Sequence, residues 1–167
     1  KYATCSYAVF DPVTRICSLS LAGHLPPAVV HPDGTVACAE LAREPPLGAA
    51  EPPFETHELH LPEESLLVFC TDGLIESATR DIDQGLAQLQ RILTRGVAST
   101  SYFPAVDGEG GSLDDLCDVV VSELLPDREQ TNDDAALLIA RTRCTPAGDV
   151  ASCSLLDDPR AAGQARE

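Results

Sequence analysis

Residues 66–77 read LLVFCTDGLIES, an apolar run that ends on the carboxylate Asp72 and the glycine Gly73. A short, continuous apolar run bounded by turn residues is typical of a strand that is buried on both faces. A carboxylate at the end of such a strand is held rigidly at the edge of a sheet. The stretch therefore predicts a buried strand over 66–71 that carries Asp72 to a sheet edge.

The segments before this stretch predict further strands. Residues 2–10 and 15–22 are rich in strand-forming residues and are joined by the turn sequence DPVT, so they predict a hairpin. Shorter strands are expected within AGHLPPAVV (22–30) and TVACAEL (35–41). FETHELHL (54–61) alternates polar and apolar residues and predicts a half-buried strand.

The segments after it change to a helical period. DIDQGLAQLQRILTRG (81–96) has apolar residues at helical spacing, with Gly96 as an expected stop signal. SLDDLCDVVVSELLP (112–126) begins with Ser112, an expected N-cap. DAALLIART (134–142) predicts a last buried strand.

This order of elements predicts one α+β layered domain over 1–142. Strands come first, then two helices and one final strand, which differs from the alternating order of parallel α/β proteins. With so few helices, one sheet face is expected to lack cover. Residues 143–167 have no sustained periodicity and are rich in Pro, Gly and charge, so they predict a mostly disordered tail.

Composition excludes several classes of partner. The 167 residues include 27 acidic and 11 basic ones, for a formal net charge of −16. Such a charge repels nucleic acid and anionic membrane surfaces. There is no apolar run long enough for a membrane helix, and the 7 cysteines form no CxxC pair. These features predict a cytoplasmic protein that binds neither nucleic acid nor membrane.

Two more carboxylates, Asp133 and Asp134, stand immediately before the last predicted strand. If that strand pairs antiparallel with 66–71, they would meet Asp72, and neighbouring anions favour a bound cation. Oxygen ligands suit Mg²⁺ or Mn²⁺ rather than zinc. The alternative is that both stretches are ordinary loop sequences. A phosphohydrolase with a nucleophilic Asp two residues before Asp72 is excluded, because Cys70 occupies that position.

Four fragments of the sequence resemble those of a known family and occur in the same order. LAGHLPPAVV with its DG turn, PLG, LLVFCTDGLIES and NDDAALLIAR occur in the order seen in bacterial SpoIIE/RsbU-type phosphatases. These belong to the metal-dependent protein serine/threonine phosphatase (PPM, type 2C) superfamily. The resemblance covers roughly residues 2–142. It implies an α-β-β-α sandwich with two Mn²⁺ or Mg²⁺ ions between its sheets.

The resemblance also implies roles for individual residues. Asp72 and Asp133 match metal ligands of the family, while Gly73 and Asp134 would support them. His24 would orient a loop near the site through ring hydrogen bonds. No protein nucleophile is implied, because a water activated by the two metal ions attacks the phosphoryl group. The implied substrate is phosphoserine or phosphothreonine on a regulatory protein, such as an anti-sigma-factor antagonist.

The chain departs from the family pattern in one respect. It contains neither a GGD-[WYF]-[YF]-D stretch nor a D-[VI]-x-G-H-G stretch, which carry the family's other metal ligands. We therefore expect the C-terminal part of a phosphatase domain, without its N-terminal strands and helices and with weak activity or none. Exposed sheet edges would then favour a homodimer or a domain swap. The alternative is a catalytically silent regulatory or protein-interaction module derived from a phosphatase.

Overall fold

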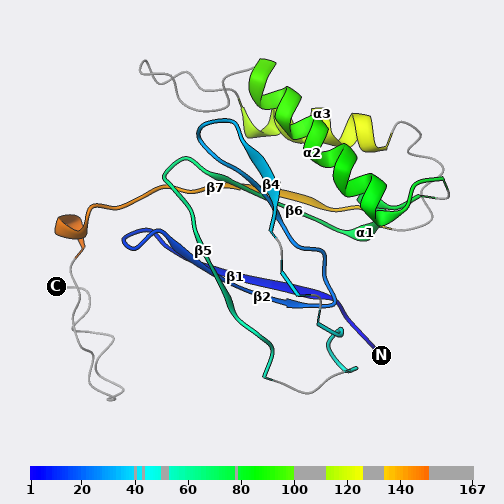
Figure 1. Cartoon of the computed structure of the whole chain (residues 1–167), viewed down its shortest axis with the longest axis horizontal. Helices are drawn as coiled ribbons and strands as arrows, with labels where there is room; N and C mark the ends of the chain where they lie inside the picture. Colours follow the sequence, from blue (N-terminus) through cyan, green and yellow to red (C-terminus); the bar gives the residue numbers. More distant parts are fainter. Residues whose placement is uncertain are drawn as a thin grey trace, which may run out of the picture.

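Two antiparallel sheets lie face to face, and helices cover the outer side of one of them (Figure 1). One sheet has three strands in the order β1-β2-β5, and the other has four in the order β4-β3-β6-β7. This computed structural model describes residues 1–39, 41–42, 44–49, 53–77, 79–99, 112–125 and 134–150. The predicted α+β class is confirmed.

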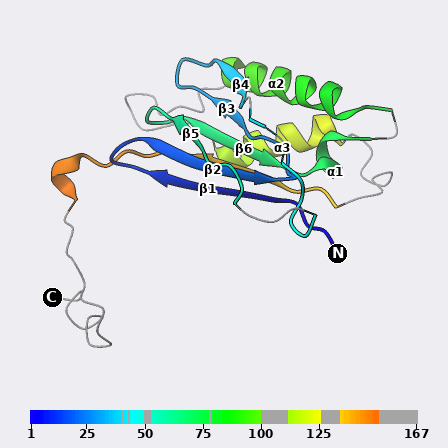
Figure 2. The same cartoon turned by 60° about the horizontal axis from the view of Figure 1, so that its bottom comes forward.

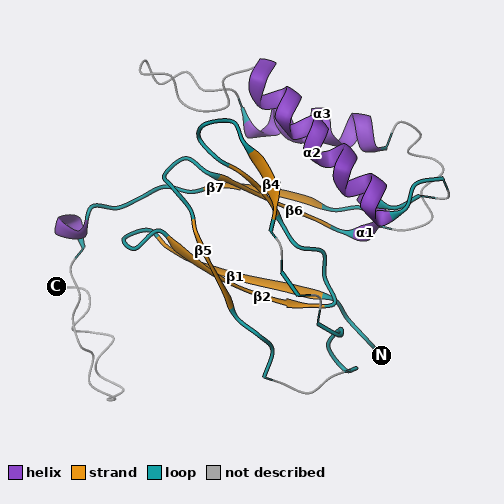
Figure 3. Ribbon diagram, viewed as in Figure 1, coloured by secondary structure: helices purple, strands orange, loops and turns teal. Residues whose placement is uncertain are grey.

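The strands and helices follow the predicted order along the chain (Figure 3). The strands are β1 (Cys5–Asp11), β2 (Ile16–Ala22), β3 (Ala28–Val30), β4 (Val36–Cys38), β5 (His57–His60), β6 (Leu66–Cys70) and β7 (Leu137–Arg141). The helices are α1 (Asp72–Ile75), α2 (Ile82–Ser99), α3 (Leu113–Leu124) and a short 3₁₀ helix, η2 (Ala147–Asp149). The predicted hairpin is confirmed, since β1 pairs antiparallel with β2.

Strand β6 is apolar throughout because both of its faces are buried. Successive side chains of a strand point to opposite faces of the sheet. Leu66, Val68 and Cys70 belong to the core beneath the helices. Leu67 belongs to the core between the two sheets, where Phe69 packs against it. The strand lies between β3 and β7, and its pairing with β7 extends to its far end at Cys70.

Helices α2 and α3 form the layer over the four-stranded sheet (Figure 2). Leu89 and Leu93 of α2 and Leu116 and Val120 of α3 are all buried there. The predicted N-cap of α3 is confirmed, because the Ser112 hydroxyl accepts a hydrogen bond from the Asp114 N–H at 3.1 Å. This layer is the larger of the two cores.

No helix among the described residues lies on the outer face of the three-stranded sheet. Tyr7 and Val9 of the edge strand β1 are accordingly 66% and 49% exposed. None of the described helices is long and apolar enough to cross a membrane. The described part of the chain is thus a sandwich with helices on one side only.

The end of helix α2 differs from its prediction. Gly96 was predicted to end the helical segment 81–96, but α2 continues to Ser99, because a glycine weakens a helix without ending it when neighbouring turns are packed. Helix α1 was not predicted. In the predicted tail, the Thr145 N–H bonds the Pro12 carbonyl at 3.0 Å, just before η2, while residues 151–167 lie outside the described part.

Candidate metal centre

Asp72 stands where β6 passes directly into α1. The Leu74 N–H bonds the Thr71 carbonyl at 3.1 Å, and the Glu76 N–H bonds the Asp72 carbonyl at 2.7 Å, so the chain turns into a helix at this carboxylate. The Asp72 side chain is exposed, and its Oδ1 accepts a hydrogen bond from the Gly73 N–H at 3.0 Å. Gly73, predicted as a supporting residue, therefore orients the carboxylate through its backbone.

The start of the β7 segment is tied to the residue before Asp72. The Thr71 N–H bonds the Ala136 carbonyl at 3.1 Å, and the Thr71 hydroxyl accepts from the Ala136 N–H at 2.9 Å. The same hydroxyl donates to the Asp134 carbonyl at 3.2 Å. The structure thus brings the Asp134 backbone beside the Asp72 turn, as the antiparallel pairing of β6 and β7 predicted. Asp133 lies outside the described residues, so its place as a ligand stays a prediction.

A small cavity of about 100 Å³ joins Asp72 to His24. Gly23, Thr4, Leu25 and Ile82 complete its lining. Gly23 has a φ of +66°, and a Cβ there would lie 2.8 Å from Pro46 Cβ, so only glycine fits this turn. The His24 Nδ1 is hydrogen-bonded to the Thr4 hydroxyl at 3.2 Å. This bond orients the imidazole ring at the wall of the cavity that Asp72 also lines.

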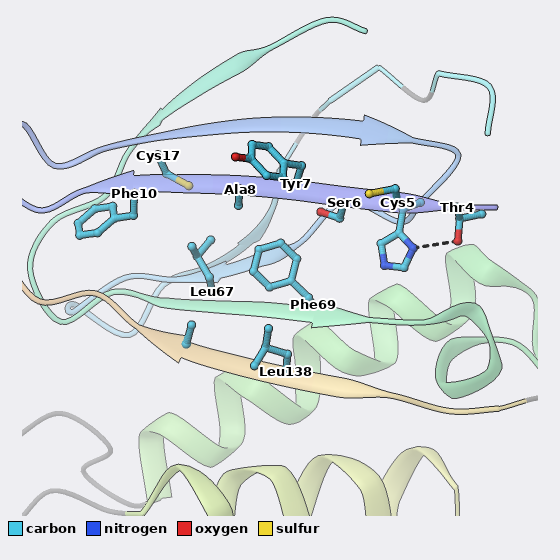
Figure 4. Close-up of a pocket in the computed structure, with 12 residues that line it drawn as sticks. Thr4, Cys5, Ser6, Tyr7, Ala8, Phe10, Cys17, Leu67, Phe69 and Leu138 are labelled. Carbon is cyan, nitrogen blue, oxygen red and sulfur yellow. Dashed lines mark hydrogen bonds between the residues drawn. The ribbon is translucent and has the colours of Figure 1, made fainter. Parts of the chain in front are cut away.

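A larger, mainly apolar groove of about 670 Å³ opens between the two sheets and shares Thr4 and His24 with the small cavity. Phe10 from β1 and Phe69 from β6 line it, and Leu138 of β7 lies at its wall with 60% of its surface exposed (Figure 4). The groove runs between β1 and β7, the edge strands of their sheets. It is therefore an open side of the sandwich.

Cys70 is the thiol nearest in sequence to Asp72, but it is not suited to nucleophilic attack. Its side chain is buried at the end of β6, and burial raises its pKa to about 12, with a smaller contribution from Cys38. The thiolate is the reactive form of cysteine. At neutral pH this thiol stays protonated, so the site offers hard oxygen donors rather than a cysteine nucleophile.

The donor atoms at this site are oxygens, the type that a hard divalent cation prefers. Asp72 offers a carboxylate at a cavity, and Mg²⁺ and Mn²⁺ prefer oxygen ligands. Within the described ranges, no three His, Cys, Asp or Glu side chains gather to hold a metal ion. A full ligand set would thus need groups beyond those that the structure describes.

A family model identifies the family of this chain. The family model for Stage II sporulation protein E (SpoIIE) matches residues 1–143. The chain therefore belongs to the SpoIIE family, and the predicted resemblance is confirmed.

Solved structures share the fold of this chain. The structure of the RsbU and RsbW domains of a Mycobacterium tuberculosis protein is 26% identical with a TM-score of 0.68, and the match covers 99% of this chain and 43% of that one. The phosphatase domain of SpoIIE from Bacillus subtilis is 16% identical with a TM-score of 0.61, covering 86% and 59%. RsbX in complex with magnesium is 15% identical with a TM-score of 0.53, covering 84% and 56%. The chain thus spans about half the length of the relatives it matches.

Thr71 and Arg80 hold the two ends of α1, and sequence reasoning did not single out either residue. Thr71 joins the two strand ends, and Arg80 bonds the end of α1. The sequence signal for Thr71 is its position directly before the expected ligand Asp72. Nothing in the local sequence marks Arg80, since its partners lie as far away as Leu124.

Proposed function

We propose that this chain is part of a metal-dependent protein serine/threonine phosphatase, with Asp72 and Asp133 as ligands of Mn²⁺ or Mg²⁺. The intact domain would hold two ions. The observation that supports this most directly is the position of Asp72, which lines a cavity with His24 while its neighbour Thr71 bonds the segment that begins at Asp134. When bound, the metal ions would activate a water molecule and stabilise charge on the phosphoryl group.

The residues of this chain would act by holding and orienting. The Gly73 N–H fixes one oxygen of the Asp72 carboxylate, which leaves that side chain oriented before a cation arrives. The bond between His24 and Thr4 fixes the ring that borders the same cavity. Membership of the SpoIIE family and the magnesium complex of the relative RsbX support the choice of cation.

The proposed substrate is phosphoserine or phosphothreonine on a regulatory protein, such as an anti-sigma-factor antagonist. The relative from Mycobacterium tuberculosis carries RsbU and RsbW domains in one structure, which supports a place in a regulatory system of this kind. A protein substrate is also compatible with the exposed position of Asp72. We expect the chain itself to be weakly active or inactive, because it spans only part of its relatives.

A titration of this chain with MnCl₂, followed by amide NMR, tests the metal site. Mn²⁺ broadens the signals of nearby amides, so those of Gly73 and His24 should broaden first. Asp72→Asn should raise the Mn²⁺ concentration needed for this selective broadening by about tenfold to 100-fold. Asp118→Asn, which removes the same charge from the exposed face of α3, should leave it unchanged. Equal broadening in the Asp72 and Asp118 variants would contradict the proposal.

The alternative function, a catalytically silent module, predicts a different response to Mn²⁺. Such a module has no need for a cation at Asp72, so it would show only general broadening over its acidic surface. If the chain is part of a phosphatase, a longer domain that includes the family's other metal-binding motifs should instead hydrolyse p-nitrophenyl phosphate with Mn²⁺. Asp72→Asn should abolish that activity. Activity that survives this substitution would refute the assignment of Asp72.

We also propose that a second copy of this chain pairs with the open side of the sandwich. The support is the apolar groove between the edge strands, together with exposed Tyr7, Val9 and Leu138 on those strands. Light scattering over a concentration series should show a dimer, and Leu138→Glu should shift it towards monomer. A monomer at all concentrations would contradict the pairing.

A further inference from the structure

Arg80 connects the ends of helices α1 and α3. Its Nε donates to the Ile75 carbonyl at 2.7 Å, and its Nη2 donates to the Leu74 carbonyl at 3.0 Å. Both carbonyls belong to the last turn of α1, which begins at Asp72. The same Nη2 donates to the Leu124 carbonyl at 3.1 Å, at the end of α3. One guanidinium group therefore holds the C-termini of α1 and α3 together.

The chemistry of helix ends explains why an arginine suits this position. The last carbonyls of a helix have no partner within the helix, and the helix dipole makes that end partially negative. Neither α1 nor α3 has a basic residue in its own last turn. Arg80 supplies a fixed cation and several donors in one plane, which a lysine does not provide.

Two further contacts make this junction rigid. The Arg80 Nη1 donates to Gln88 Oε1 at 3.3 Å, and the Gln88 Nε2 donates to the Glu123 carbonyl at 3.1 Å. Helix α2 also lies very close to α1, since a Cβ on Gly85 would stand 2.2 Å from the Ile75 carbonyl oxygen. All three helices are thus fixed at one point.

The consequence concerns Asp72, the first residue of α1. At the end of this short helix, Arg80 bonds the Leu74 carbonyl and, through the same nitrogen, the Leu124 carbonyl of α3. Just before its start, the Thr71 hydroxyl bonds the Asp134 carbonyl. The helix that begins with Asp72 is therefore tied at both ends to distant parts of the chain.

We propose that Arg80 is a positioning residue of the metal centre, which holds Asp72 in place by fixing the short helix α1 to the end of α3. This inference rests on the proposed metal-binding function. None of the described contacts joins Arg80 to Asp72, so Arg80 would act through the carbonyls of α1 and α3. Its loss should leave the chain folded but lower its affinity for Mn²⁺ by about tenfold.

The test compares three variants of this chain in the MnCl₂ titration. Arg80→Gln removes the charge and most donors, and Arg80→Lys keeps the charge alone. Arg91→Gln is the matched control, because Arg91 is exposed and its Nε bonds only the Ala87 carbonyl of its own helix in the described contacts. We expect both Arg80 variants to raise the Mn²⁺ concentration needed to broaden Gly73 about tenfold, and the control to leave it unchanged.

A second measurement separates positioning from loss of stability. Ile92→Val removes one buried methyl group from α2 without touching the junction, so it lowers stability alone. Hydrogen exchange of the backbone amides, measured without metal, reports on the helix ends at Glu76 and Leu125. Exchange at these two amides should accelerate in Arg80→Gln and stay unchanged in Arg91→Gln.

Each outcome then has one meaning. We expect faster amide exchange in the Arg80 variants alone. We also expect a higher Mn²⁺ midpoint, which is the concentration at half-maximal broadening of Gly73, in these variants alone. An unchanged midpoint in Arg80→Gln, full rescue by Arg80→Lys, or an equal shift in Ile92→Val would overturn the inference while leaving the metal site intact. No selective broadening in the unmodified chain would instead refute the proposed function, and the inference with it.

Discussion

Replacing Gly85 by alanine should destabilise the protein, although helix propensity alone predicts the opposite. Alanine in the interior of a helix is favoured over glycine by about 1 kcal/mol. Gly85 lies in the first turns of α2, where a Cβ would stand 2.2 Å from the Ile75 carbonyl oxygen and 2.5 Å from Ile75 Cγ2. Ordinary packing begins near 3.4 Å, so α1 and α2 would have to separate by roughly 1 Å.

The magnitude follows from these opposing terms. Forcing an extra carbon into a packed junction costs about 1–3 kcal/mol. The separation also weakens the hydrogen bond of 2.7 Å from Arg80 to Ile75, which adds about 1 kcal/mol. After subtracting the propensity gain, we expect a net destabilisation of about 1–3 kcal/mol. For a chain of this size that lowers Tm by about 2–4 °C per kcal/mol.

Urea unfolding followed by circular dichroism measures this change. Gly148→Ala is the matched control, because a Cβ on Gly148 would meet no atom within 4 Å. The control should change stability by less than about 0.5 kcal/mol. If Gly85→Ala is as stable as the unmodified chain, or more stable, then α2 does not pack on the end of α1 as described, and the argument for a rigid junction at Arg80 loses its support.

Three further predictions concern the core and its termini. Ser112→Ala removes the N-cap of α3 and should lower the free energy of unfolding by about 1 kcal/mol, measured in urea. Leu93→Ala should cost about 2–5 kcal/mol because the side chain is 0% exposed, whereas Leu138→Ala, at 60% exposed, should cost less than about 1 kcal/mol. Burial raises the pKa of Cys70 from 9.0 to about 12, so the unfolded chain loses this proton first and stability should fall as the pH rises from 9.0 towards 12. Cys70→Ala should show a smaller loss of stability over the same pH range, measured by urea midpoints.

Much of the fold could be predicted because its signals are local. The hairpin of β1 and β2 follows from two strand-like runs and the short turn between them. The apolar run of β6 reports burial on both faces, because successive side chains alternate between the two cores. Ser112 marks the start of α3, because a hydroxyl at that position bonds a backbone N–H within the same turn.

The candidate site could be predicted only in part. Asp72 was identified because a carboxylate ends a buried strand, and the pairing of β6 with β7 places Asp134 beside its neighbour Thr71. The cavity shared by Asp72 and His24 needed the structure, because it depends on how the two sheets stack. No local pattern encodes such a distance.

The sequence by itself determined where the strands and the two long helices lie, which faces they bury, and which carboxylate stands at a strand end. The tertiary structure alone decided that Arg80 holds α1 to α3 and that Gly85 must lack a side chain. The physical reason is the range of the interactions. Periodicity and capping act within a few residues, whereas these contacts exist only after helices far apart in the chain have packed against one sheet.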